Sequence, residues 1–514
     1  MRSPLLAADI AALCRARALR GAPVPLLPRT MASAAIPTWE KVYINGQWSR
    51  PSSANLFDVI DSNTGKVCAR VPAAGVADVD KAVAAAREAF VSWAEKSLDE
   101  RKAVLQKVLE TWQGKKAQAA EWLCKELGCT ATFAKTVQVN MVDFHLGTSL
   151  KLVDMVKFEE KMAFGSLVVR EPIGVVGCIT PWNYPLNQIA AKVFPAMLVG
   201  CTIVLKPSEV TPVCAYLLAE AVHEAGVPPG VFNMLMGDGP NCGEAVAAHP
   251  GVDMVSFTGS TRAGRRISEV GAQTLKVVRT ELGGKSAALL LEDADLPKLV
   301  PKFMQTLMNN SGQSCNALSR MLVPKTRYDE AVELAKKVAE KTVVSFAQDE
   351  KASIGPLSSQ AQWEKVQGYI QTGIKEGARL VTGGSGKPDG LSDGFFVKPT
   401  VFADVDNKMT IAQEEIFGPV LSIIPYTTEE EAVRIANDTV YGLNNAVGSA
   451  SPEKAVAVAR KLRSGMVMIN DTSVMPDAPF GGYKQSGNAR EWGLMGLEEY
   501  LVTKTLAGKP PSKL

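Results

Sequence analysis

Two polar stretches carry residue types that could do chemistry. They are Asn309-Asn310-Ser311-Gly312-Gln313-Ser314-Cys315-Asn316 and, ahead of it in the chain, Glu281-Leu282-Gly283-Gly284-Lys285. A cysteine attacks as its thiolate, which usually needs a base, a nearby positive charge or a helix N-terminus. A single carboxylate such as Glu281 can act as a general base. The pair therefore resembles a nucleophile and a base.

The more usual partner of a catalytic cysteine is histidine. The chain has three, His145, His223 and His249, and none lies in a motif resembling the local signatures of cysteine proteases. A thiol hydrolase is therefore disfavoured. Taken alone, a free cysteine is more often a small buried hydrophobic residue than a catalyst. Both readings of Cys315 stay open until the rest of the chain is considered.

Length and composition indicate a soluble multidomain protein. At 514 residues, with 46% hydrophobic and 21% charged, the chain predicts roughly two to four globular domains. The longest apolar run, residues 194–205, is too short to cross a bilayer. The net charge is +3, of which the first 30 residues hold +4. The remaining body lacks the basic footprint of a nucleic-acid binder.

The N-terminal segment is rich in arginine and nearly free of acids. This composition resembles an organelle transit peptide and predicts import into the mitochondrial matrix for residues 1–31. A start at Met31, giving a cytoplasmic form, is the alternative. The nine cysteines are odd in number and scattered. They indicate reduced thiols rather than a disulfide framework or a metal site.

Strands and helices alternate along the body of the chain. Residues 42–48 predict a hairpin around Asn45-Gly46. Expected strands are 173–180, 202–205, 231–236, 254–257, 275–279, 286–291, 320–323, 396–402 and 420–426. Expected helices between and after them are 215–225, 242–248, 263–270, 296–308, 328–343, 361–376 and 429–436. Such alternation predicts α/β domains with parallel sheets, whose ligands lie at the carboxyl ends of the strands.

A dinucleotide is the ligand that such a sheet most often binds. The chain lacks the Gly-x-Gly-x-x-Gly fingerprint, and its nearest match, with Gly237, Gly239 and Gly243, has one residue too many. A second candidate, residues 257–264, follows a strand and opens a helix, where free N–H groups could hold a pyrophosphate. Either glycine set could instead be a simple turn.

Seven motifs together resemble the NAD(P)-dependent aldehyde dehydrogenase superfamily, in order and spacing. They are Thr180-Pro181-Trp182-Asn183-Tyr184-Pro185, Lys206-Pro207-Ser208-Glu209, Phe257-Thr258-Gly259-Ser260-Thr261, Glu281-Leu282-Gly283-Gly284-Lys285, Gly312-Gln313-Ser314-Cys315, Glu414-Glu415-Ile416-Phe417-Gly418-Pro419 and Pro479-Phe480-Gly481-Gly482-Tyr483-Lys484. The resemblance implies oxidation of an aldehyde to a carboxylic acid with NAD as hydride acceptor.

By this resemblance, Cys315 attacks the aldehyde and forms a thiohemiacetal whose oxyanion is held by the Asn183 amide and the Cys315 N–H. Loss of hydride leaves a thioester, and Glu281 activates the water that hydrolyses it. The presence of Glu281 argues against the branch that forms acyl-CoA. No metal is implied.

The resemblance also places the cofactor. The implied contacts are Ile179, Thr180, Pro181, Trp182, Lys206, Ser208, Glu209, Gly239, Gly243, Phe257, Gly259, Ser260, Leu282, Glu415 and Phe417. Glu209 can accept from ribose hydroxyls and would repel a 2′-phosphate, which favours NAD over NADP. Tyr184, Asn187 and Gln188 would line the substrate tunnel, with Ala191 nearby. Asn187, Gln188 and Ala191 stand where the aliphatic members that the chain resembles often carry apolar or bulky aromatic residues, which implies a roomier and more polar tunnel than one for short aliphatic aldehydes.

The implied architecture is a Rossmann-type NAD-binding domain, a second α/β catalytic domain and a small β oligomerisation element. The corresponding ranges are 32–152 with 173–283, 284–483, and 153–172 with 496–510. Residues 163–170 and 500–503 suit the last element by β-propensity, and it implies a homodimer or homotetramer. Alternatives within the family are a semialdehyde or betaine-aldehyde dehydrogenase. An alternative outside catalysis is a silent structural or binding protein of the same fold.

Overall fold

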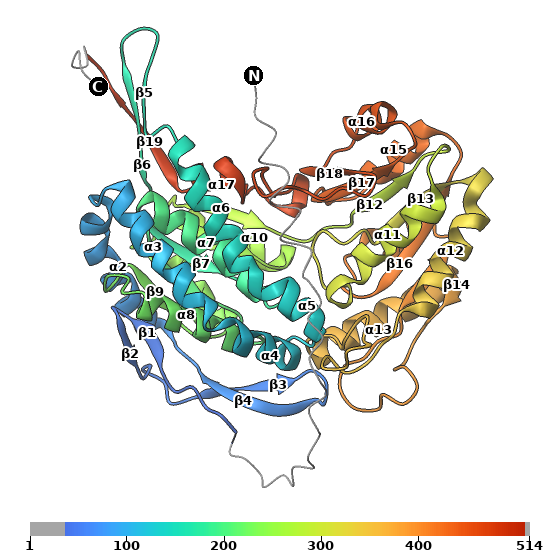
Figure 1. Cartoon of the computed structure of the whole chain (residues 1–514), viewed down its shortest axis with the longest axis horizontal. Coiled ribbons are helices and arrows are strands. Elements are labelled where there is room, and N and C mark those ends of the chain that lie inside the picture. The colour runs from blue at the N-terminus through green and yellow to red at the C-terminus, as the bar shows by residue number, and fades with distance from the viewer. Residues whose placement is uncertain (1–35, 509–514) are drawn as a thin grey trace, which may run out of the picture. The chain divides into compact units, whose positions relative to one another are not determined.

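The computed structural model describes residues 36–508, and their contacts group Pro37–Leu514 into one compact unit. The predicted extension, residues 1–31, and residues 509 and 510 of the predicted oligomerisation element lie outside the described residues. Two seven-stranded sheets, a three-stranded sheet and a two-stranded hairpin form the β-structure of the described part (Figure 1). The boundaries of the predicted domains stay predictions.

The first large sheet has the order β11-β10-β7-β8-β9-β1-β2. Its strands are β11 (Val277–Glu281), β10 (Met254–Thr258), β7 (Val175–Ile179), β8 (Thr202–Lys206), β9 (Phe232–Met234), β1 (Val42–Ile44) and β2 (Gln47–Ser49). The strands from β11 to β9 are parallel, and β1 and β2 add an antiparallel edge. The predicted parallel sheet and the hairpin at Asn45-Gly46 are confirmed.

Helices cover both faces of this sheet (Figure 1). They include α2 (Val76–Ala94), α3 (Leu98–Gln113), α4 (Lys116–Glu126), α5 (Ala131–Thr136), α6 (Met141–Leu152), α7 (Pro185–Val199), α8 (Val213–Glu224), α9 (Glu244–Ala248) and α10 (Thr261–Ala272). Alternate residues of β7 enter different cores: Val176 and Cys178 pack in one cluster, Val175 and Ile179 in another. A strand buried on both sides explains why the β7 sequence is apolar throughout.

The second large sheet has the order β14-β15-β16-β13-β12-β17-β18 and is parallel except at β14. Its strands are β14 (Arg379–Thr382), β15 (Thr400–Ala403), β16 (Val420–Tyr426), β13 (Arg320–Pro324), β12 (Ala287–Leu290), β17 (Asn444–Gly448) and β18 (Met466–Ile469). Its helices are α11 (Leu296–Met308), α12 (Tyr328–Lys341), α13 (Gln360–Lys375), α14 (Thr410–Gln413), α15 (Glu429–Asn437) and α16 (Pro452–Ala459). The predicted α/β class is confirmed for both sheets.

The small sheet has the order β19-β6-β5, all antiparallel. Its strands are β19 (Leu501–Leu506), which follows the short helix α17 (Gly493–Glu498), β6 (Leu167–Pro172) and β5 (Glu159–Lys161). A separate hairpin pairs β3 (Leu56–Asp61) with β4 (Lys66–Pro72). Among the described helices, none has the length and apolar character needed to cross a membrane.

Several predicted element bounds were wrong. The strand expected at 275–279 begins at Val277, because Leu275 lies in a turn with φ of 55°. The strand expected at 396–402 begins only at Thr400, after Pro399, since proline cannot donate to a ladder. The helix expected at 242–248 begins with a π-helical turn, Gly239–Gly243. The strand expected at 163–170 is a turn up to Ser166.

Candidate active site

The loop that carries Cys315 leaves α11 through a left-handed turn. Asn310, Ser311 and Gly312 have φ of 52°, 57° and 78°. A Cβ on Gly312 would lie 2.2 Å from the backbone of Gly418, so only glycine fits there. Non-glycine residues held in this region store strain, which is common at functional sites.

Replacing Gly312 by alanine is expected to destabilise the protein by about 2–5 kcal/mol, because the backbone strain adds to an overlap that no side chain can relieve. The control is Gly226→Ala, since Gly226 has φ of 74° but no atom within 4 Å of the added Cβ. It should cost only about 1–2 kcal/mol. Urea denaturation measures both. Equal losses would contradict the close approach to Gly418.

Hydrogen bonds fix the loop to the segment between β7 and α7. Asn183 donates from Nδ2 to the Gln313 carbonyl at 3.1 Å, and Asn310 donates from Nδ2 to the Asn183 carbonyl at 2.8 Å. The hydroxyls of Tyr184 and Ser314 lie 2.6 Å apart. The two residues before the nucleophile are therefore held to the predicted oxyanion donor and to its neighbour Tyr184.

The Glu281 motif lies against the same loop. Glu281 ends β11, and a Cβ on Gly284 would lie 2.4 Å from the Cys315 carbonyl oxygen. A Cβ on Gly283 would lie 2.6 Å from a carboxylate oxygen of Glu415. The two glycines thus permit close packing on the nucleophile loop and on Glu415. The fold brings together the two polar stretches that the sequence singled out.

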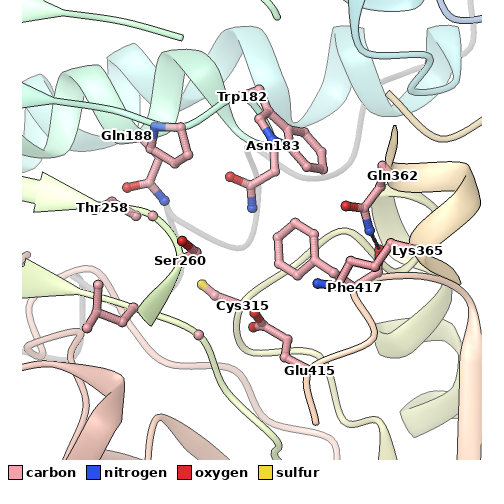
Figure 2. Close-up of a pocket in the computed structure, with 14 residues that line it drawn as sticks. Trp182, Asn183, Gln188, Thr258, Ser260, Cys315, Gln362, Lys365, Glu415 and Phe417 are labelled. Atoms are coloured by element: carbon pink, nitrogen blue, oxygen red, sulfur yellow. Dashed lines mark hydrogen bonds between the residues drawn. The ribbon is translucent and has the colours of Figure 1, made fainter. Parts of the chain in front are cut away.

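One cavity, with about 620 Å³ of empty space, contains the thiol (Figure 2). It lies beside the ends of β10 and β11 and the start of α7, and α13 closes one side. Its lining residues are Pro181, Trp182, Asn183, Gln188, Thr258, Gly259, Ser260, Leu282, Gly283, Cys315, Gln362, Lys365, Glu415 and Phe417. Ten of these were predicted site residues; Thr258, Gly283, Gln362 and Lys365 were missed as contacts.

The remaining predicted cofactor residues lie along the carboxyl edge of β7 and β8. Lys206 ends β8, and its Nζ lies 3.0 Å from Glu209 Oε2. A Cβ on Gly243 would lie within 4.0 Å of both Lys206 and Ile179, whereas the space beside Gly239 is open. Nearby, Thr180 Oγ1 is buried without a hydrogen-bond partner. Ser208 and Phe257 are buried next to these strand ends.

These residues fit a dinucleotide. Ser260 caps α10 and accepts from Ala263 N at 3.2 Å, so the first turn of α10 offers N–H groups suited to a pyrophosphate. Lys206 and Glu209 supply a cation and a carboxylate suited to ribose hydroxyls. The orphaned hydroxyls of Thr180 and Thr258 are further unused donors on this edge.

Glu415 and Phe417 line the cavity that holds the thiol. Glu415 accepts from the Gly284 N–H at 2.8 Å, and burial raises the pKa of its carboxyl despite that bond and Lys365. Phe417 has φ of 63° and meets Trp182 edge to face with ring centroids 5.5 Å apart. Gln362 donates to the Phe417 carbonyl at 2.8 Å and so holds this strained residue.

Glu281 is a buried carboxyl group without a hydrogen-bond partner. It is 3% exposed, and neither of its oxygens finds a partner among the described residues. A Cβ on Gly481 would lie 2.9 Å from Oε1. Burial raises the pKa of Glu281 well above its usual range, Glu491 raises it further, and Lys192 opposes the rise. A base with a raised pKa suits proton abstraction near neutral pH.

Lys192 and Glu491 form a buried ion pair beside Glu281 that the sequence reading missed. Their side chains are 1% and 5% exposed, and they form an ion pair although the two residues lie far apart in the sequence. A lysine in the apolar run of α7 was the available signal, because a buried charge needs a partner. Similarly, Gln362 and Lys365 lie three residues apart, which puts them on one face of α13. This spacing was visible in the sequence of the predicted helix and was the available signal for these two residues.

The surroundings of the thiol raise its pKa. Cys315 stays partly exposed, but burial raises its pKa, and the carboxylates of Glu281, Glu415 and Glu491 raise it further. None of the eight cysteines in the described residues forms a disulfide, and those residues contain no group of three His, Cys, Asp or Glu side chains placed to hold a metal.

A second cavity, with about 780 Å³ of empty space, approaches the nucleophile loop at Asn316. Cys315 also packs against Leu443, Met466 and Phe480, two of which line this cavity. Its lining residues are Lys302, Phe303, Thr306, Asn309, Asn316, Asn444, Met466, Met468, Asn470, Asp471, Thr472, Ser473, Val474, Phe480 and Trp492. Its walls combine aromatic and thioether side chains with amides and hydroxyls.

The predicted tunnel residues lie in different places. Gln188 lines the first cavity, and Tyr184 bonds Ser314. Asn187 lines neither cavity; its Oδ1 lies 2.7 Å from His145 Nε2. That imidazole packs on Trp492 with centroids 5.5 Å apart. Asn187 therefore supports, through His145, the Trp492 side chain that lines the second cavity. The tunnel residues as a set stay a prediction.

The chain belongs to the Aldehyde dehydrogenase family, whose model matches residues 48–506. A 3-succinoylsemialdehyde-pyridine dehydrogenase from Pseudomonas sp is 49% identical over 91% of this chain and 98% of its own. A mutant of aldehyde dehydrogenase C from Pseudomonas syringae, solved with NAD+ and octanal, is 47% identical, with a TM-score of 0.91 over 92% of this chain and 98% of the other. A betaine aldehyde dehydrogenase from Staphylococcus aureus with NAD+ is 34% identical, with a TM-score of 0.89 over 92% and 95%.

Proposed function

We propose that this chain oxidises an aldehyde to the carboxylic acid with NAD as hydride acceptor, through a covalent intermediate on Cys315. The observation that carries the proposal is the meeting of Cys315, Asn183 and Glu281 beside an edge that fits a dinucleotide. Membership of the family and relatives solved with NAD+ support it.

In this mechanism the Cys315 thiol first loses its proton to water, and the thiolate sulfur then attacks the carbonyl carbon, so that the carbonyl oxygen becomes an oxyanion. The Asn183 amide and the Cys315 N–H donate to that oxygen, an interaction worth a few kcal/mol in the transition state. NAD, when bound, supplies the hydride acceptor. Glu281 then takes a proton from water as the water attacks the thioester. The C–S bond breaks, Cys315 leaves as its thiolate and the carboxylic acid is released.

The proposal is tested with the purified full chain, NAD and a panel of aldehydes, by absorbance of the reduced nicotinamide at matched enzyme concentration. Aldehyde-dependent reduction supports it. No reduction with any aldehyde would favour the second candidate, a silent protein of this fold. The presence of the nucleophile, base and oxyanion donor in one site speaks against that candidate.

Glu209 is expected to set the preference for NAD over NADP. Glu209→Gln removes the carboxylate that would repel a 2′-phosphate, so the ratio of kcat/KM for NAD to that for NADP should fall by about tenfold, or about 1.4 kcal/mol. The control is Glu330→Gln. Glu330 is an exposed carboxylate on α12 that pairs with Arg327. A ratio that stays unchanged in Glu209→Gln would remove Glu209 from this role.

The substrate class is proposed at the level of aldehydes, with semialdehydes and betaine aldehyde as the alternatives. The relatives that act on those two compounds are 49% and 34% identical. Amides and hydroxyls at Asn309, Asn470 and Thr472 in the second cavity suit a substrate with a polar end. If the enzyme oxidises short unbranched aldehydes much faster than polar or bulky ones, the prediction of a polar tunnel is wrong.

We further propose that a second copy of the chain covers the small sheet. Strands β19 and β5 are its two edges, and edge strands expose unpaired backbone groups. Phe164, Val502 and Leu506 of this element are exposed apolar side chains. Sedimentation equilibrium of the full chain should give a dimer or tetramer; a monomer at all concentrations would refute this.

Mitochondrial localisation stays a prediction from the composition of residues 1–31. Its test is the position of a fluorescent protein fused after residue 31. Fluorescence spread through the cytoplasm would favour the alternative form that starts at Met31.

A further inference from the structure

Gln188 is a buried amide without a partner in the cavity that holds Cys315. Its side chain is 5% exposed and lines that cavity, and its Oε1 finds no hydrogen bond among the described residues. Its neighbours on α7, Leu186 and Ile189, are apolar and fully buried. An apolar side chain at position 188 would therefore pack without leaving a polar group unpaired.

Each of the other buried glutamines of the described part makes at least one side-chain hydrogen bond, although Gln138 Oε1 and Gln367 Nε2 have no partner. These hydrogen bonds join Gln138 to the Asn183 carbonyl (3.2 Å), Gln313 to the Asn310 carbonyl (3.0 Å), Gln362 to the Phe417 carbonyl (2.8 Å) and Gln367 to the Gly386 N–H (2.6 Å). A buried polar group left unpaired costs about 1–3 kcal/mol. Gln188 is the exception, because neither its Oε1 nor its Nε2 bonds another described residue, and a wholly unpaired amide in a reaction cavity indicates a partner that arrives with the ligand.

Asn183 and Gln188 present their amides to one thiol. Both side chains extend from the start of α7 toward Cys315 (Figure 2). Asn183 uses one N–H on the Gln313 carbonyl at 3.1 Å, which leaves its second N–H for a substrate. The amide nitrogen of Gln188 has both its N–H groups free.

We propose that Gln188 donates from Nε2 to the aldehyde oxygen as it becomes an oxyanion, so that two side-chain amides share the charge at this site. The inference rests on the proposed function and adds a catalytic residue to it. When the Cys315 sulfur forms its bond to the carbonyl carbon, the π pair of the C=O bond moves to oxygen. The N–H donors stabilise that charge until the C=O bond forms again as hydride leaves for NAD.

The test replaces Gln188 by methionine, which has a similar shape and no N–H. The rate of the first turnover, measured by rapid mixing at saturating NAD, should fall about 10-fold to 10²-fold for every aldehyde of the panel, because one oxyanion donor is lost. The Kd for NAD should not change. The melting temperature should hold or rise, because the unpaired amide is gone.

A second measurement needs no cofactor. An aldehyde that adds reversibly to Cys315 protects the thiol from iodoacetamide, and Gln188→Met should weaken this protection about 10-fold while the alkylation rate without aldehyde stays the same. Gln367→Met, an equally buried exchange on α13, is the control and should change neither measurement.

Three outcomes would overturn the inference while leaving the proposed function intact. They are an unchanged first-turnover rate, a loss confined to aldehydes with a polar group on the α-carbon, and a loss explained by weaker NAD binding. The last two would assign the Gln188 amide to a substrate substituent or to the cofactor. If the parent protein itself oxidises no aldehyde, the proposed function fails first, and the protection measurement alone decides whether Gln188 binds the oxyanion.

Discussion

Replacing Cys315 by alanine is expected to lower kcat/KM for aldehyde oxidation by about 10⁴-fold or more, because Cys315 is the only thiol among the residues that line the cavity. The backbone of the loop is held by its left-handed turn and by the close approach of Gly284 to the Cys315 carbonyl. Neither feature involves the thiol. The Kd for NAD, measured by quenching of tryptophan fluorescence, should therefore stay within about twofold of the parent value.

Cys68→Ala is the matched control for this variant. Cys68 and Cys315 are the two cysteines of the described part that are not fully buried, and Cys68 lies on β4. Its replacement should leave kcat/KM unchanged. Full activity in Cys315→Ala would remove the covalent mechanism. Loss of both activity and NAD binding would show instead that the thiol supports the fold of the site.

Replacing Glu281 by glutamine is expected to separate the two halves of the reaction. The first turnover should still produce about one equivalent of reduced nicotinamide, whereas steady turnover should fall by about 10²-fold to 10⁴-fold, because the thioester loses its general base. Rapid mixing followed by steady-state absorbance measures both. Glu126→Gln, which also replaces a fully buried carboxyl group, should leave both rates unchanged. Equal loss of both phases would exclude a role limited to hydrolysis.

The pH dependence of Glu281 gives a second test. Its pKa is raised by burial and by Glu491, so the steady rate of the parent should rise with pH as this carboxyl ionises. The native state holds this proton above the pKa of the unfolded chain, so stability falls as pH rises between the unfolded and the raised folded pKa. In Glu281→Gln the rate should no longer rise with pH, and the melting temperature should fall less with rising pH than it does in the parent protein.

Much of the site was accessible from sequence because its residues lie in short motifs at strand ends. The alternation predicted a ligand at the carboxyl ends of the parallel strands, and the family resemblance named Trp182, Lys206, Ser260 and Glu281 as site residues. The strands β17 and β18 were not predicted. Their runs, Asn444–Gly448 and Met466–Ile469, are short, and only the first is buried throughout. Both strands depend on pairing with distant parts of the chain, which local pattern does not contain.

The polar tunnel shows the limit of a register argument. Asn187 and Gln188 are adjacent, but successive side chains on a helix point about 100° apart. Gln188 therefore faces the thiol, while Asn187 turns to His145. Sequence identified two amides, and only the direction of α7 decided which of them meets the reacting atoms.

The sequence by itself identified the family and the dinucleotide-binding class of sheet, and through that resemblance it predicted Cys315 as nucleophile and Glu281 as base, because each depends on residue types in short segments. The tertiary structure decided what surrounds them. The Lys192–Glu491 pair, the carboxylates that raise the pKa of Cys315, and the unpaired amide of Gln188 arise from contacts between distant segments. Burial, charge and hydrogen-bond partners are properties of packing, and packing is fixed only when the chain has folded.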